Sequence, residues 1–448
     1  MNEATRISPA DIEKAINAVM AIKDGPRALQ LYMDICTKCG TCAEQCHVAK
    51  ADPRRRTNPA ARSDLIRKLY KRDGSLLTKI RGLLGGDNVA LTEDDLETWV
   101  RDFYECSGCR RCAVYCPVGI DNSVITRKAR AIVHALGVSP KYMVQTQEIS
   151  DKFGNDEGQS YEAFMEAIRF LESELEEEHG IPIKIPVNQE GADILFVPAS
   201  ADLISFPETQ MGSATFFHAA GLNWTMSSEA FDGANFGLFT GDDAHMKRKN
   251  KVLHDACLKL KVKKLVIGEC GHAYRIAKRI GGTFYWGQDI PYEITNIFIL
   301  AAEELRKGTL KFDPTKNPGP VTYHDPCNFA RSCGVTEEPR EMLRACVTDL
   351  REMTPNRQNN WCCGGGGGLA VMDGKEAVKK NEVTFMEYRM NVGGKMKLNQ
   401  IKETGAKYLA APCSNCKRQL MQLMDYHKMD VKVGGVLDLF DKAIILDK

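Results

Sequence analysis

The chain has 448 residues, too many for one ordinary hydrophobic core, so we expect two or three domains. Its 60 basic side chains balance 59 acidic ones, which gives no reason to expect nucleic acid as a partner. No apolar run approaches the roughly 20 residues that cross a bilayer, and the charged N-terminus has no export signal. We therefore expect a cytoplasmic protein, a compartment in which 17 cysteines more often bind metal than form disulfides.

Two cysteine runs lie in the first third of the chain, and each has the spacing Cys-x2-Cys-x2-Cys-x3-Cys. This is the spacing of bacterial ferredoxins, in which the fourth cysteine of each run reaches across to the other 4Fe–4S cluster. A zinc site or a disulfide framework fits four cysteines in eleven residues less well. The motif rule predicts two ligand sets: Cys36, Cys39, Cys42 and Cys116 for one cluster, and Cys106, Cys109, Cys112 and Cys46 for the other.

The stretch between these runs reads as helical. Apolar residues recur at helical spacing over residues 63–70, and Thr92 has the character of a helix N-cap. The basic residues 54–56, with Arg62, Arg67 and Lys68, suggest either a docking face or a solvated helix surface. We predict an all-helical domain over residues 1–145, followed by a helical connector over 146–190.

From Ala192 onward short apolar strands alternate with helical stretches, which indicates an α/β fold with a largely parallel sheet. The strands are ADILFVPA (192–199), KKLVIGEC (263–270), PVTYHDPC (320–327) and AKYLAAPC (406–413). Residues 244–260 and 337–353 read as helices.

This half of the chain looks duplicated, as half-domains over residues 191–310 and 311–448. Aligning the strands places Cys270 on Cys413 and Ser200 near Cys327, and a further alignment pairs Trp224 with Trp361. The first half-domain has lost most of its cysteines, so we expect only the second to hold metal.

A third cysteine set lies in the second half-domain, and it comprises Cys327, Cys362, Cys363, Cys413 and Cys416. Adjacent cysteines followed by the glycines 364–368 suit a distorted, open iron–sulfur unit, because glycine allows close approach of the backbone. A zinc site is the alternative. Cys333 is either a nearby redox thiol or a loop thiol, and Cys270 reads as a buried relic. His272 and His324 are either proton donors or structural histidines.

These motifs resemble known proteins over nearly the whole chain. The two runs with a long helical insert are similar to the all-helical ferredoxin module of fumarate reductase and heterodisulfide reductase subunits. The cysteine, Cys-Cys-Gly and Cys-x-x-Cys pattern, led by His324-Asp325-Pro326-Cys327, resembles the CCG domain. The longer last interval implies an insertion around residues 370–400. The combination resembles the D subunit of heterodisulfide reductase, and the cysteine-poor first half is closest to the cytoplasmic subunits of the Dsr, Tmc and Hmc membrane complexes.

The resemblance implies an α + α/β protein: a two-cluster ferredoxin module, then a duplicated CCG domain with a degenerate first half. It implies two 4Fe–4S clusters and a further, non-cubane 4Fe–4S cluster. The implied enzyme takes electrons from a quinone through a membrane cytochrome b subunit and acts on a disulfide or trisulfide of a small sulfur-carrier protein or thiol cofactor. Its other partners would be iron–sulfur or cytochrome c subunits, which attach it to the inner face of the cell membrane. Relay for a 2-hydroxy-acid dehydrogenase, or relay without a substrate, stays open as an alternative.

Overall fold

The computed structural model describes residues 8–53, 57–71, 91–281, 290–372 and 384–446. The chain forms two compact units, each built from three chain segments. The first unit consists of Met1–Val144, Leu238–Asp242 and Gly364–Met396, and the second of Gln145–Gly237, Asp243–Cys363 and Lys397–Lys448. The sequence predicted a first domain ending at residue 145 and shows no sign of the two later segments.

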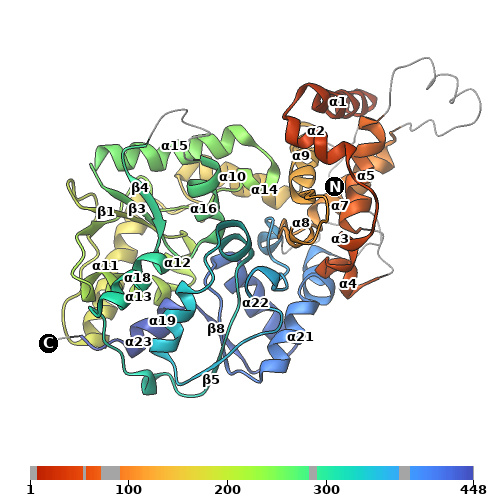
Figure 1. Cartoon of the computed structure of the whole chain (residues 1–448). Coiled ribbons are helices and arrows are strands. Elements are labelled where there is room, and N and C mark those ends of the chain that lie inside the picture. Colours follow the sequence, from red (N-terminus) through yellow and green to blue (C-terminus); the bar gives the residue numbers. More distant parts are fainter. Residues whose placement is uncertain (1–7, 54–56, 72–90, 282–289, 373–383, 447–448) are drawn as a thin grey trace, which may run out of the picture. The chain divides into compact units, whose positions relative to one another are not determined.

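Among its described residues the first unit forms helices and no strand. Its elements, coloured red to orange in Figure 1 up to α9, are α1 (Pro9–Met20), η2 (Ala21–Asp24), α2 (Arg27–Asp34), α3 (Thr41–Glu44), α4 (His47–Ala51), α5 (Pro59–Tyr70), α7 (Glu93–Tyr104), α8 (Arg111–Val114), α9 (Asn122–Ala135), η7 (Leu369–Val371), α20 (Phe385–Tyr388) and η8 (Arg389–Gly393). The chain passes between the units within α10 (Lys141–Phe153), α14 (Gly237–Thr240) and α21 (Lys395–Thr404).

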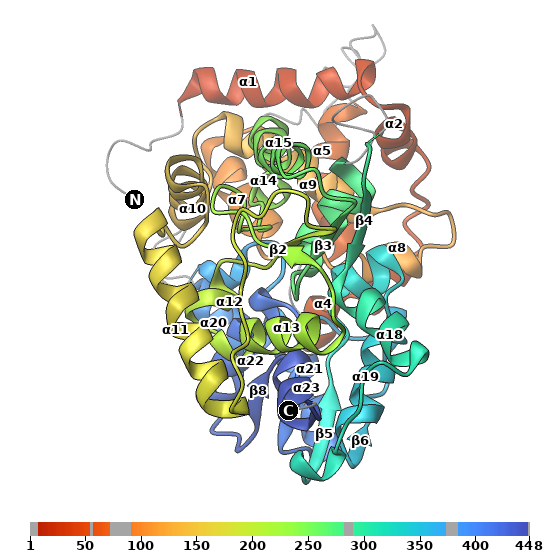
Figure 2. The same ribbon diagram turned by 90° about the vertical axis from the view of Figure 1, so that its left-hand side faces the viewer.

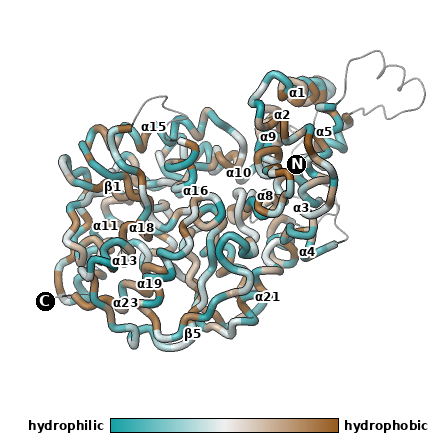
Figure 3. Tube along the Cα trace, in the orientation of Figure 1, coloured by the Kyte–Doolittle hydropathy of each residue, from teal (hydrophilic) through white to brown (hydrophobic). Residues whose placement is uncertain are grey.

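Local signals explain where these helices begin. The side chain of Asn58 caps α5, whose first residue is Pro59. Thr92 and Asp95 form a reciprocal capping box at the start of α7. Both helices were predicted from the sequence. Brown and teal stretches alternate along the helices in Figure 3, as expected where one face of a helix packs inward.

The second unit contains two four-stranded parallel sheets with the same internal order, β2-β1-β3-β4 and β6-β5-β7-β8. The four strands predicted from apolar runs are present as β1, β3, β5 and β7. The strands are β1 (Ile194–Val197), β2 (Trp224–Thr225), β3 (Lys264–Ile267), β4 (Glu293–Asn296), β5 (Pro320–Tyr323), β6 (Asp349–Arg351), β7 (Tyr408–Ala410) and β8 (Lys432–Gly434).

Two expectations for this unit were wrong. The helix predicted over residues 337–353 ends at Cys346, and Asp349–Arg351 forms edge strand β6 instead. The pairing of Trp224 with Trp361 also fails, because Trp224 lies in β2 whereas Trp361 lies in no strand. The edge strand of the second sheet is β6, which lies earlier in the chain than Trp361.

Helices cover the sheets and join them into one core. Helix α13 packs against α23, and α18 packs against α19, as Figure 2 shows. Helix α11 lies within the stretch predicted as a helical connector, and it is capped by Ser160 and closed by Gly180 in the left-handed conformation. Besides the helices through which the chain passes between the units, the helical elements of this unit are α11 (Tyr161–His179), α12 (Ala201–Ile204), α13 (Pro207–Ala219), α15 (Asp243–Lys259), α16 (Gly271–Arg275), η3 (Ile276–Gly281), α18 (Ile297–Lys307), η4 (Pro314–Lys316), η5 (Asn328–Cys333), α19 (Glu338–Cys346), η6 (Arg357–Asn359), α22 (Ser414–Tyr426) and α23 (Leu437–Ala443).

Candidate metal centres

Four cysteines of the first unit surround one small cavity. Cys36, Cys39 and Cys42 from the first run meet Cys116 from the second. Apolar residues, including Ile120, and a few polar ones, including Asn122, complete the lining. These four thiols are the first ligand set that the motif rule predicts, and soft thiolates converging on one space suit iron.

The two cysteine runs share an unusual backbone. Lys38 and Gly40 in the first run have positive φ, and so do Gly108 and Arg110 at the same places in the second. A left-handed residue between right-handed ones turns successive peptide N–H groups toward one side, which forms a concave site for an anion. The Gly108 N–H donates to Cys106 Sγ at 3.4 Å. For lysine and arginine this conformation costs about 1–3 kcal/mol each, a strain of the kind that clusters at functional sites.

The second predicted set also comes together. Burial, followed by the nearby sulfurs of Cys109 and Cys106, raises the pKa of Cys112 well above its usual value. Burial raises the pKa of Cys46 too, which lies near the same two sulfurs. Cys46, Cys109 and Cys112 are buried and Cys106 is half-buried. Thiols crowded in this way ionise only when positive charge compensates them, and bound iron supplies such charge. His47, directly after the first run, is buried with Nδ1 3.9 Å from Cys109 Sγ.

Arg62 brings a buried cation to this second set. Its side chain is 3% exposed, and Nη1 donates to the Thr57 carbonyl. Burial alone would lower the pKa of Arg62, but the sulfurs of Cys106 and Cys46 outweigh it and raise the pKa. Arg62 and Arg67 are therefore buried and form no docking face or solvated surface, contrary to expectation, whereas Lys68 is exposed. The neighbouring basic residues 54–56 lie outside the described residues.

Arg130 ties the second cysteine run to the inserted segments of the same unit. Its guanidinium donates to the carbonyls of Cys106 at 2.5 Å, Phe239 at 2.9 Å and Gly367 at 2.8 Å. Gly366 and Gly367 approach the backbone of Ser107 and Cys106 so closely that a Cβ atom would lie 2.6 and 2.8 Å from their carbonyl oxygens. The sequence predicts the close approach of these glycines at the third cysteine set, whereas Gly366 and Gly367 approach the ferredoxin loop.

The second unit brings four further cysteines together. Cys363 Sγ lies 3.3 Å from Cys416 Sγ, and hydrogen bonds link Cys363 to Cys362 and Cys413 to Cys416. All four side chains are buried. Cys413 is the N-cap residue of α22 and Cys416 lies in its first turn, where the helix dipole favours a thiolate. Hydrogen bonds hold the pKa of Cys363 and of Cys413 well below the usual value.

The fifth predicted cysteine of this set reaches the same sheet edge by another route. Cys327 follows β5, which pairs with β7, and Cys413 follows β7. The carboxyl ends of adjacent parallel strands lie at one edge, where α/β folds place their sites. Cys327 is buried, whereas Cys333 ends the π-helical turn η5 and packs half-buried against the core.

A buried ion pair holds the loop that carries Cys327. Arg340 of α19 donates to both carboxylate oxygens of Asp325, at 2.7 and 2.8 Å, and both side chains are almost fully buried. The Asn360 amide donates to the Asp325 carbonyl, which ties the approach to Cys362 to the same loop. None of these contacts could be predicted from the spacing of the cysteines in the sequence.

Two basic side chains accompany the four thiols. His324 is buried and lies with Cys363 and Cys416 in one group of potential ligand atoms. Burial lowers the pKa of His324. Lys397 is fully buried near Cys363 and Cys362, and burial lowers its pKa to about 8. His324 stands close to a cysteine in the sequence, but Lys397 carries no sequence signal because it lies among other charged residues of a helix.

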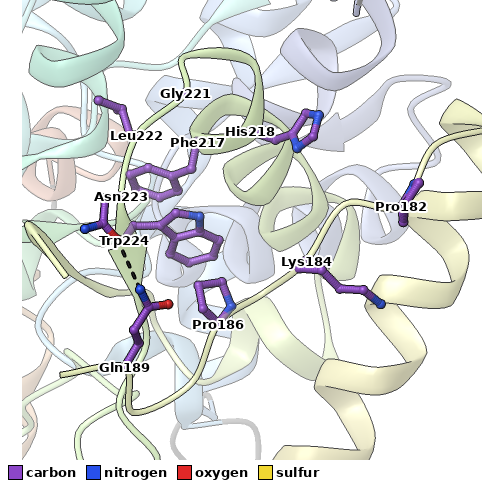
Figure 4. A pocket seen from close by; sticks show the side chains of 10 residues that line it. All are labelled: Pro182, Lys184, Pro186, Gln189, Phe217, His218, Gly221, Leu222, Asn223 and Trp224. Carbon is purple, nitrogen blue, oxygen red and sulfur yellow. Dashed lines mark hydrogen bonds between the residues drawn. The ribbon is translucent and has the colours of Figure 1, made fainter. Parts of the chain in front are cut away.

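Another cavity, of about 400 Å³, lies at the surface of the second unit (Figure 4). Stacked Phe217 and Trp224 form its base, with ring centroids 4.5 Å apart, and Lys184 and His218 lie at its rim. No cysteine lines it among the described residues, and Trp224 begins its strand there. It is therefore separate from the candidate metal centres.

Comparisons with known proteins agree with both cysteine-rich regions. Residues 32–120 match the 4Fe-4S dicluster domain, and residues 321–421 match the cysteine-rich domain called CCG. The chain is 30% identical to the Hdr-like menaquinol oxidoreductase iron–sulfur subunit of Archaeoglobus profundus, over 94% of this chain and 81% of that protein. A second such protein, from Archaeoglobus fulgidus, shows the same identity and coverage.

A more distant similarity covers both proteins almost completely. The D subunit of the dihydromethanophenazine:CoB–CoM heterodisulfide reductase of Methanosarcina mazei is 23% identical over 94% of this chain and 96% of its own length. The domains indicate 4Fe–4S clusters as cofactors. The chain therefore belongs to the family of iron–sulfur oxidoreductase subunits that includes those of the Hdr-like menaquinol oxidoreductases and the D subunit of heterodisulfide reductase.

Proposed function

We propose that the chain conducts electrons through its two ferredoxin-type clusters to a third cluster in the CCG domain, which acts on a disulfide. The proposed ligands of the ferredoxin clusters are the sets Cys36, Cys39, Cys42, Cys116 and Cys106, Cys109, Cys112, Cys46. The proposed ligands of the third, non-cubane cluster are Cys327, Cys362, Cys363, Cys413 and Cys416. The observation that carries the proposal is the buried group of four thiols in the second unit, with Cys363 and Cys416 in sulfur contact.

The residues around that group suit the reduction of a disulfide. Opening a disulfide to two thiols takes two electrons and two protons, whereas 4Fe–4S clusters transfer one electron at a time. Lys397, with a pKa near 8, holds a proton at neutral pH that it can give up without a large cost. His324 beside Cys363 is a second group able to hold or release a proton. The electrons can also run from thiols to the ferredoxin clusters with the same residues.

The relatives suggest where the electrons come from. The Archaeoglobus proteins are named as subunits of a menaquinol oxidoreductase, and the Methanosarcina protein as one of a heterodisulfide reductase. No helix in the described part of the chain is long and apolar enough to cross a membrane. We propose that a membrane cytochrome b-type subunit passes quinol electrons to this chain and holds it at the inner face of the membrane. Its substrate would be the disulfide or trisulfide of a small sulfur-carrier protein or thiol cofactor.

We also propose that the second unit arose by duplication. Its two sheets have the same strand order, and Cys270 and Cys413 each follow the third strand of their sheet in that order. The first half-domain would then be the copy that lost its cysteine set.

An iron count with spectroscopy tests the proposal. We expect about twelve irons per chain after anaerobic purification, and a third paramagnetic signal that changes when a disulfide is added. Cys362→Ser should remove that signal and leave both ferredoxin signals intact. About eight irons and no disulfide-sensitive signal would instead mean a relay with two clusters, and the reductase function would be wrong.

A further inference from the structure

The first half-domain reaches the cysteine set of the second. Strand β3 leads into Cys270, Gly271 and His272, the last two of which begin α16. Cys270 is fully buried and lies near Cys413, and the imidazole of His272 hydrogen-bonds to Cys413. The segment that contains Cys270 and His272 therefore lies beside Cys413 of the second half-domain.

Three contacts fix this segment against the turn that follows Cys327. A Cβ atom on Gly271 would lie 3.2 Å from Asn328 Cβ and from the ring of Phe329, so the backbones approach closely. Arg275 Nη1 donates to Asn328 Oδ1 at 3.2 Å, and the rings of Tyr274 and Phe329 lie 5.8 Å apart. The position of His272 therefore follows from packing on both of its sides in the chain.

The hydrogen bonds of His272 define which ring nitrogen carries the proton. The backbone N–H of Asn235 points at Nε2 at 3.2 Å. A backbone N–H can only donate, so Nε2 accepts and the hydrogen of the neutral ring is on Nδ1. Nδ1 lies 3.4 Å from Cys270 Sγ, and the same side chain hydrogen-bonds to Cys413, for which Nδ1–H is the one donor that the neutral ring has. The imidazole, 3% exposed, thus directs its one N–H at sulfur.

We infer that His272 donates this N–H to the ligating sulfur of Cys413 and thereby raises the reduction potential of the third cluster. The inference rests on the proposed function, in which Cys413 is a ligand. A hydrogen bond to a ligating sulfur draws electron density from it and stabilises the reduced state, which is one of the ways proteins set iron–sulfur potentials. The half-domain without a cysteine set of its own contributes a positioning residue to the cluster of the other.

Two substitutions separate this electronic role from a structural one. In His272→Asn the side-chain amide stands close to the position of Nδ1, so the donor to sulfur is kept and the bond from Asn235 is lost. In His272→Gln the amide oxygen reaches the position of Nε2, so the bond from Asn235 is kept and the donor to sulfur is lost. We expect the potential of the third cluster to fall in His272→Gln and to stay near the native value in His272→Asn.

The measurement is a redox titration of the full chain followed by electron paramagnetic resonance, without oxygen. The ferredoxin signals serve as an internal reference that should not move. His254→Gln is the matched control, because His254 is also buried in this half-domain but bonds to the Tyr292 hydroxyl at 2.9 Å. Its third-cluster potential should equal that of the native chain.

Either of two results would overturn the inference. One is an unchanged potential in His272→Gln with native iron content. The other is the reverse pattern, a shift in His272→Asn alone, which would show that His272 acts by holding Asn235. About eight irons in the native chain would contradict the proposed function itself. The iron count is therefore a separate test from the shift in potential.

Discussion

Glu269 is a buried acid whose surroundings raise its pKa into the neutral range. It is 1% exposed, accepts the backbone N–H groups of Val436 and Leu437 on one oxygen, and lies 3.5 Å from the ammonium of Lys417. Burial raises its pKa from 4.5 to about 7 even with Lys417 beside it, because Asp438 and Asp202 add negative charge nearby. One lysine does not neutralise this group of carboxylates.

We predict that Glu269→Gln removes a pH dependence of stability. A carboxyl whose pKa is higher in the folded chain contributes stability that is fully present below its unfolded pKa and is lost as the pH rises through about 7. The native chain should lose roughly 1.4 kcal/mol per pH unit from this group between about pH 4.5 and 7. Thermal midpoints of both chains at pH 5.5 and 7.5 check this. The midpoint of the native chain should fall more between these pH values than that of Glu269→Gln, and an equal fall in both chains would contradict the prediction.

At the scale of elements, Arg340 shows how one helix positions a ligand loop. It joins α19 to Asp325, two residues before Cys327, in a pair with almost no exposure to water. Such a pair adds little net stability when intact, but removing one partner leaves an uncompensated buried charge.

We predict that Arg340→Met destabilises the second unit by about 3–5 kcal/mol, since the buried Asp325 carboxylate then loses its charged partner. Arg344→Met is the control on the same helix, because Arg344 is largely exposed and its ion pair with Glu337 is 3.7 Å long. That change should stay within about 0.5 kcal/mol. Denaturant unfolding followed by far-ultraviolet circular dichroism measures both, and similar losses in the two variants would refute the argument.

The elements that the sequence predicted share one property, which is an unbroken apolar run or a cap. Strand β1 is buried along its whole length, so its four residues are all apolar. Strand β6 escaped prediction because it is an edge strand, with Asp349 and Arg351 facing solvent or each other, and it follows directly on a helix. The apolar residues at helical spacing continue from α19 as far as Val347, so the sequence shows no break before the strand.

Part of the candidate sites could be predicted from the sequence. The ferredoxin ligand sets follow from the spacing within the two cysteine runs, and the structure brings the predicted ferredoxin thiols together. His272, Lys397 and Arg62 come to the thiols through tertiary packing, which no local spacing encodes. Cys270 is buried, as predicted, but its nearness to Cys413 is a tertiary feature that the sequence around it does not encode.

At the scale of the whole molecule, the first unit depends on chain segments far from its main part. The Tyr388 hydroxyl donates to the Glu105 carbonyl at 2.6 Å, and Arg130 finds two of its acceptors, Phe239 and Gly367, outside residues 1–144. A buried arginine that loses acceptors pays a desolvation cost of about 1–3 kcal/mol per unsatisfied group.

We predict that a fragment of residues 1–144 holds its iron poorly. It keeps all eight ferredoxin cysteines but lacks these acceptors and the glycines that pack on Cys106. Iron retained after gel filtration with a chelator should fall well below that of the full chain, and its thermal midpoint should drop. Tyr388→Phe in the full chain offers a milder comparison, with a loss of about 1 kcal/mol. A fragment as stable as the full chain would contradict the dependence.

The discontinuous first unit also constrains how the protein is made. Its earliest helices leave the ribosome long before residues 364–396, which complete the packing around the second ferredoxin loop. Nascent chains emerge at about 5–20 residues per second. The first unit therefore stays incomplete for tens of seconds, and its thiols are accessible to oxidants and other metal ions during that time. A chaperone or an iron–sulfur assembly factor that shields these thiols during the delay should therefore raise the yield of folded chain.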